Sequence, residues 1–170
     1  EFDYARAAIR AGVCDYILKP VRPSTFQESM RILQGRLDEL YYTIRNDMLQ
    51  QMCRGTGLKE KQYFRRVFSS ETYYVALLRK NSLPRRFVNS RETEIFSIKN
   101  EQMMVYGRDE REALYICPRE LIFHSSFYQL LQHILEKEKR TAAYLTLVWN
   151  EDPVTAEELP QKIPCLYQEL

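Results

Sequence analysis

Apolar side chains recur at alternating spacings of four and three residues along the stretch that follows Pro23. The series consists of Phe26, Met30, Leu33, Leu37, Leu40 and Ile44. This is the heptad spacing of a coiled-coil seam, so the pattern predicts a long helix with one apolar stripe. Ser24, with Gln27 three residues later, predicts an N-cap and a capping box at its start. Gly55 predicts its end near residues 53–56.

Beyond Ile44 the apolar positions slip by one residue, to Met48 and Met52. Such a slip predicts that the helix leaves a coiled coil and packs on a globular core with ordinary helical periodicity. A long helix with one apolar stripe cannot bury that stripe alone. Two explanations stay open: the stripe packs against the sheet of its own chain, or it joins two protomers in a parallel two-stranded coiled coil. The heptad spacing favours the homodimer.

The second half of the chain alternates between strand-like and helix-like patterns. Residues 72–78 form a nearly continuous apolar run, which predicts a central strand buried on both faces. Two further strands, at residues 93–98 and 103–106, are expected to form a hairpin. Another is expected at residues 113–117, and a last, buried one at residues 142–148. Helices are expected at residues 58–68, from Ser125 or Ser126 to 139, and after the capping-box pair Thr155 and Glu158, where Pro160 and Pro164 break the regularity. We therefore expect an α+β fold, with helices covering one face of an antiparallel sheet.

Composition narrows the class of protein. The chain has 170 residues, of which 45% are hydrophobic and 28% charged, as in a soluble globular protein. The net charge of +2 argues against non-specific nucleic-acid binding, because acidic residues are interspersed with the basic ones. No apolar run is long enough for a membrane span, so no membrane partner is expected. Four widely spaced cysteines are expected to be reduced and buried in a cytoplasmic protein: Cys14, Cys53, Cys117 and Cys165.

No residue pattern points to catalysis, a cofactor or a metal. Neither GxGxxG nor GxxxxGK[ST] occurs, and His124 and His133 are nine residues apart rather than on one helical face. The remaining candidates have structural explanations. Asp109 with Glu110 and Glu151 with Asp152 are expected in solvated turns, Trp149 in the core, and Arg85 with Arg86 in a short basic turn. We therefore expect a protein that is not an enzyme.

The first residues carry a more specific pattern. Residues 4–12 form an Ala-rich helix closed by Gly12, and residues 15–21 form a short apolar strand that ends at Lys19 and Pro20. With the helix that follows, residues 2–34 resemble the last third of a response-regulator receiver domain. The resemblance implies that Lys19 contacts the phosphoryl group on an aspartate, that the peptide bond before Pro20 is cis, and that Tyr16 changes rotamer on activation. Receivers place their acidic pair and phospho-acceptor earlier, so we expect no phosphorylation chemistry in this chain.

A consequence concerns the apolar residues that a receiver sheet would cover: Ala8, Ile9, Val13, Ile17 and Leu18. Without the other receiver strands they should pack on another surface or remain mobile. We therefore expect them in a contact, within the chain or with another molecule, that differs from the receiver arrangement.

The second half resembles a degenerate nucleotide-cyclase-like (GGDEF-type, ferredoxin-like) domain, and residues 147–170 are similar to the end of the middle domain of AraC-type response regulators. A cyclase needs a Gly-Gly-Asp/Glu-Glu turn to approach nucleotide and metal. The corresponding turn, residues 99–102, contains no glycine and one carboxylate, Glu101. We therefore expect no cyclase activity.

These resemblances imply three parts: a receiver remnant at 1–22, a dimerisation helix at 23–56 and an α+β middle domain at 57–170. The implied function is dimerisation and signal transmission in a bacterial two-component, AraC-type transcription regulator. Its partners in a longer protein would be a sensor histidine kinase and, through an output domain outside this chain, promoter DNA. Two alternatives stay open: a ligand-sensing or cyclase-like nucleotide-binding domain, and a purely structural oligomerisation module.

Overall fold

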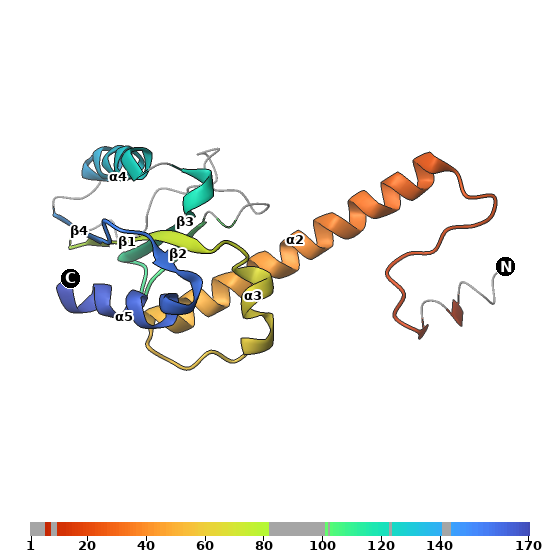
Figure 1. Ribbon diagram of the computed structural model, residues 1–170, viewed down its shortest axis with the longest axis horizontal. Helices are drawn as coiled ribbons and strands as arrows, with labels where there is room; N and C mark the ends of the chain where they lie inside the picture. The colour runs from red at the N-terminus through yellow and green to blue at the C-terminus, as the bar shows by residue number, and fades with distance from the viewer. Residues whose placement is uncertain (1–5, 8–9, 82–100, 102, 123, 141–143) are drawn as a thin grey trace. The chain divides into compact units, whose positions relative to one another are not determined.

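The computed structural model describes residues 6–7, 10–81, 101, 103–122, 124–140 and 144–170 (Figure 1). The chain divides into two compact units, Glu1–Leu40 and Tyr41–Leu170, which are described separately. The division falls within the long helix α2 (Pro23–Cys53), whose last part belongs to the second unit.

Helix α2 begins and ends at positions that its sequence explains. Pro23 occupies the first turn, where its missing N–H is no loss, so Ser24 lies inside the helix and not at the N-cap position that we expected. At the other end Gly55 adopts a left-handed conformation with φ of 66°. Its N–H donates to the carbonyl of Met52 over 3.0 Å, and the N–H of Thr56 donates to Gln51 over 3.0 Å. These two bonds form a Schellman motif, which confirms the predicted end of the helix.

The segment before α2 is less regular than expected. Gly12 has a φ of 70°, as a glycine that closes a helix should, but residues 15–21 form no strand. The expected strand is wrong because an isolated strand has no neighbour to pair its backbone groups. The segment instead contacts α2, where Arg36 donates to the carbonyl of Cys14 over 3.3 Å.

The apolar residues of this segment are at most partly covered within the described chain, and their contact with another molecule stays a prediction. Val13 and Leu18 are more than half exposed, and Ile17 is half-buried. Ala8 and Ile9 lie outside the described residues. The described part of the first unit therefore leaves apolar surface open.

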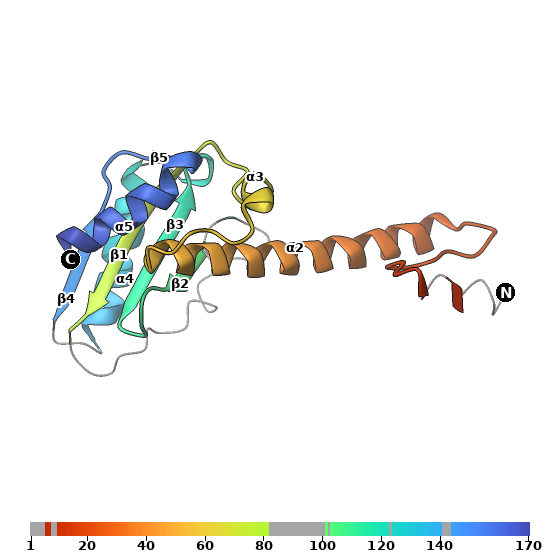
Figure 2. The same cartoon turned by 90° about the horizontal axis from the view of Figure 1, so that it is seen from below.

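The second unit is built on an antiparallel sheet whose strands lie in the order β2-β3-β1-β4, with β5 paired to β1 (Figure 2). The strands are β1 (Thr72–Lys80), β2 (Met103–Tyr106), β3 (Glu112–Pro118), β4 (Leu145–Trp149) and β5 (Val154–Thr155). Strand β1 is central and buried, as its apolar run predicts.

Strand β4 is half-buried along its length, not buried as expected, because among the described residues it pairs with β1 alone and forms an edge. The first arm of the expected hairpin, residues 93–98, lies outside the described residues, whereas its second arm is β2.

Helices cover both faces of the sheet, not one. The last part of α2, the short helix α3 (Phe64–Val67) and α5 (Leu159–Glu169) share a core with one face, while α4 (His124–Lys139) packs on the other (Figure 1). The physical reason is that β1 and β3 are apolar on both sides, so each side needs a cover.

Local helix signals were partly right. The capping box formed by Thr155 and Glu158 is present, with the Thr155 N–H donating to the Glu158 carboxylate over 2.9 Å. Pro164 lies inside α5 rather than ending it. The helix expected at 58–68 is reduced to a 3-10 turn, η1 (Lys61–Tyr63), and α3, and α4 begins at His124 so that Ser125 and Ser126 lie within it.

Candidate interaction surface

The apolar stripe on the first half of α2 is exposed. Phe26 and Met30 are each 50% exposed, Leu37 is 49% and Leu40 is 52% exposed. With the half-buried Leu33 they line a groove of about 800 Å³ within the first unit. The groove is completed by Cys14, Gln27, Arg31, Gln34 and Arg36. Exposed apolar side chains that line one groove are typical of interaction surfaces, so this stripe is the candidate.

The polar residues beside the stripe include two glutamines and two arginines. In the heptad frame set by Phe26 and Leu33, Gln27 and Gln34 follow the seam on one side. Arg31 and Arg36 also line the groove. Arg31 pairs with Glu28 over 2.7 Å, and Arg36 donates to the carbonyl of Cys14. Both arginine side chains therefore have partners within the first unit.

Ile44 differs from the other five seam residues. It is half-buried and packs against the core of the second unit, together with Tyr41 and Tyr42. Met48 and Met52 are fully buried there, as the predicted slip of the apolar pattern indicates. The exposed stripe therefore ends at Leu40, about one turn earlier than the spacing alone indicates.

Arg45 lies where α2 passes from exposed to buried apolar residues, and its burial was not predicted from the sequence. Its side chain is buried and donates to the carbonyl of Val67 over 2.5 Å. A charged residue between apolar ones normally predicts exposure, and the burial of Arg45 depends on distant partners that include the Val67 carbonyl and the sulfur of Met103.

The receiver-like residues lie just before α2. The peptide bond between Lys19 and Pro20 is cis, as the resemblance implies, and both residues are exposed. Tyr16 is also exposed. The hydroxyl of Ser29 on α2 is the main group that lowers the pKa of the Asp15 carboxyl, followed by the backbone N–H of Tyr16. Hydrogen bonds from α2 thus hold part of this segment against the helix.

Glu101, whose carboxylate was considered for a cyclase site, is hydrogen-bonded to residues at the start of the sheet. It accepts hydrogen bonds from the backbone N–H and the hydroxyl of Ser69, over 2.7 and 2.5 Å, and from the phenol of Tyr73. The N–H of Ser70 also donates to it over 3.4 Å. The side chain therefore ties down the chain just before β1.

The other candidates are spread over the second unit. His133 is exposed on α4, Asp109 pairs with Arg111, and Glu151 is exposed in a turn. Trp149 packs on the aromatic rings of α4. Arg85 and Arg86 lie outside the described residues. Among the residues that the structure describes, no three His, Cys, Asp or Glu side chains come together as a metal site.

The cysteines do not all follow the expectation of burial. Cys53 and Cys117 are buried, but Cys14 and Cys165 are exposed. Burial raises the pKa of the Cys53 thiol to about 11 and that of Cys117 to about 12. Both buried thiols are therefore protonated at neutral pH and act as small apolar side chains.

Comparison with known proteins identified no relative. No protein family, no curated protein and no solved structure matches this chain. In the described stretches, no helix combines the length and the apolar character needed to cross a membrane.

Proposed function

We propose that this chain is the dimerisation and signal-transmission segment of a bacterial two-component transcription regulator of the AraC type. The observation that carries the proposal is the exposed apolar stripe on α2, from Phe26 to Leu40. Its occupant is the same stripe of a second copy, because a heptad seam is self-complementary in a parallel pair of helices.

The available apolar surface is large enough to support a dimer. Fully burying a Leu, Met or Phe side chain is worth roughly 1.5–3 kcal/mol, and the stripe residues have about half of that surface left to bury. Ten such side chains in a dimer would contribute on the order of 10 kcal/mol. Association costs about 4–15 kcal/mol, which leaves a net gain of at most about 6 kcal/mol. We therefore expect a weak dimer that forms at about 100 μM and is not permanent.

The receiver-like segment is the proposed input. Lys19 and Pro20 stand four and three residues before α2, and hydrogen bonds from Ser29 and Arg36 attach the preceding residues to the helix. A change in the receiver of a longer, cytoplasmic protein would therefore act directly on α2. A sensor histidine kinase would drive that change, and promoter DNA would bind through an output domain.

The second unit is the proposed spacer between input and output. Its strand order, β2-β3-β1-β4 with antiparallel neighbours, supports a ferredoxin-like arrangement of the cyclase type. The partners of Glu101 support a structural role for the carboxylate that a cyclase would use for metal. We therefore propose that this unit is not an enzyme and needs no cofactor.

Sedimentation equilibrium tests the seam. The wild-type chain should form dimers at about 100 μM. The double change Leu33→Asp with Leu37→Asp should weaken the dimer by about a hundredfold, because the half-exposed Leu37 and the less exposed Leu33 of two copies together lose roughly 3 kcal/mol. Ile32→Asp is the matched control, because Ile32 is 43% exposed on the same helix but lies off the seam. A monomeric wild type, or equal loss of dimer in the control, would contradict the proposal.

A further inference from the structure

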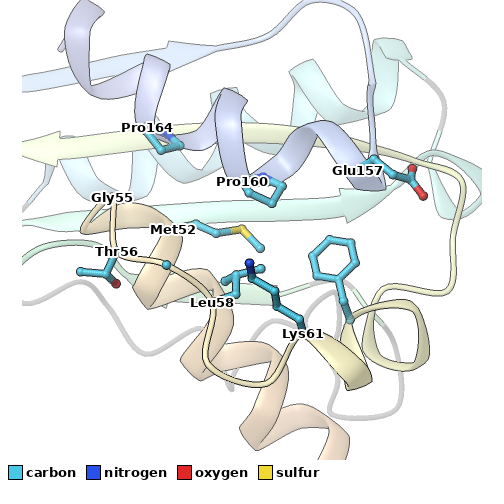
Figure 3. A pocket seen from close by; sticks show the side chains of 10 residues that line it. Met52, Gly55, Thr56, Leu58, Lys61, Glu157, Pro160 and Pro164 are labelled. Carbon is cyan, nitrogen blue, oxygen red and sulfur yellow. The ribbon is translucent and has the colours of Figure 1, made fainter.

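The second unit contains a cavity that the proposed dimer does not use. It has a volume of about 660 Å³ and lies where the end of α2, the turn after it and helix α5 meet (Figure 3). Its lining comes from Met52 on α2, Leu58 in the turn, Phe64 on α3, and Pro160 and Pro164 on α5. Cavities of this size typically hold small molecules.

The wall of the cavity is mainly apolar. Figure 3 shows Met52 opposite the rings of Pro160 and Pro164, with Leu58 below them. The two proline rings therefore add hydrocarbon surface to this side of α5. The shape suits the flat or extended apolar body of a small molecule.

Two charged residues line the cavity, and they are not equivalent. Glu157 is already neutralised by an ion pair with Arg65. Lys61 has no carboxylate partner within the described part of the chain, and Figure 3 shows its side chain extending between Leu58 and Met52. The cavity therefore combines an apolar wall with one uncompensated positive charge.

We propose that this cavity binds a small organic anion, with an apolar body against Met52 and the α5 prolines and a carboxylate beside Lys61. A nucleoside triphosphate fits less well, because several phosphate charges would face one ammonium group. Such a ligand would bridge α2 and α5 and so stabilise the packing of the long helix on the second unit. The proposal goes beyond the dimer and does not depend on it.

Isothermal calorimetry on the full chain tests the proposal with three carboxylates and their neutral amides: naphthylacetate, indoleacetate and octanoate. Each pair shares its apolar body, so the difference in affinity isolates the negative charge. We expect at least one acid to bind in the micromolar to millimolar range, about two- to fivefold more tightly than its amide, as an exposed ion pair allows. Lys61→Gln should remove that difference. Lys59→Gln is the matched control, because Lys59 does not line this cavity and should leave the difference unchanged.

A second variant tests the place of binding. A side chain added at Gly57 meets no atom within 4 Å, and Gly57 lines the cavity, so Gly57→Phe should fold and fill it. Binding of acid and amide should both be lost, and Leu58→Trp should repeat the result. Binding should survive Leu33→Asp with Leu37→Asp, which separates the cavity from the groove on the first unit.

Three results would overturn the proposal: no binding by any acid, equal binding of acid and amide with no effect of Lys61→Gln, or binding that persists in both cavity-filling variants. None of them bears on the dimer, whose failure would appear in sedimentation instead.

Discussion

Replacing Tyr167 by Phe should stabilise the second unit or leave it unchanged, although the residue is a half-buried tyrosine in α5. Its hydroxyl is buried and makes no well-formed hydrogen bond among the described residues, with the weakly polar thiol of Cys53 beside it. The hydroxyl lies close to Gly107, where an added Cβ would be 2.5 Å from it. The aromatic ring keeps its main partner, the guanidinium of Arg108 at 3.8 Å from the ring centroid, when the hydroxyl is removed.

The size of the effect follows from the cost of an unpaired polar group. A buried hydroxyl without a partner costs about 1–3 kcal/mol of desolvation, and a weak contact with a thiol returns only part of that. We therefore expect Tyr167→Phe to raise the free energy of unfolding by about 0–1 kcal/mol. Burial raises the pKa of the phenol far above neutral pH, so the hydroxyl is protonated under all ordinary conditions.

Tyr73→Phe is the matched comparison. The Tyr73 hydroxyl donates to the carboxylate of Glu101 and accepts from the N–H of Ser70 over 3.0 Å. Hydrogen bonds to charged groups contribute about 1.5–3 kcal/mol, so this variant should lose roughly that much stability. The same chemical change should thus have opposite effects at two positions of one domain.

Urea denaturation followed by the fluorescence of Trp149 measures both variants, because the chain has one tryptophan and it lies in the second unit. The expected gap between the two variants is about 1.5–4 kcal/mol in the free energy of unfolding. A loss of more than 1 kcal/mol in Tyr167→Phe would refute the reasoning, because it would mean that the hydroxyl has a good partner.

Two further changes test the helices. Gly35→Ala should stabilise α2 by roughly 1 kcal/mol, because an added Cβ meets no atom within 4 Å and Ala is the better helix former. Circular dichroism should therefore show a higher melting temperature, and no increase would contradict the helix. Glu158→Gln should lower stability at neutral pH, since the backbone N–H and then the hydroxyl of Thr155 hold the pKa of Glu158 below its ordinary 4.5. The stabilisation by the Glu158 carboxylate is complete above its ordinary pKa and is lost as the pH falls through its pKa in the folded protein. The melting temperatures of wild type and variant should therefore converge in acid. A constant difference would argue against the capping box.

The sequence alone determined the elements whose causes are local. The end of α2 at Gly55, the capping box of Thr155 and Glu158, and the buried strand β1 each depend on residues a few positions apart. Local hydrogen bonding and periodicity are therefore enough to predict them. The same holds for the slip of the apolar pattern, which correctly placed Met48 and Met52 in a core.

Tertiary structure decided what depends on distant residues. Lys80 and Glu138 form a buried ion pair between β1 and α4, and Glu101 meets Ser69, which is 32 positions away. A charged residue at the end of a strand or helix usually predicts exposure, so no local signal reveals such burial. The helices on both faces of the sheet and the cavity at Lys61 likewise depend on residues far apart in the sequence. Each exists because the chain brings separate elements together, which periodicity along the sequence does not encode.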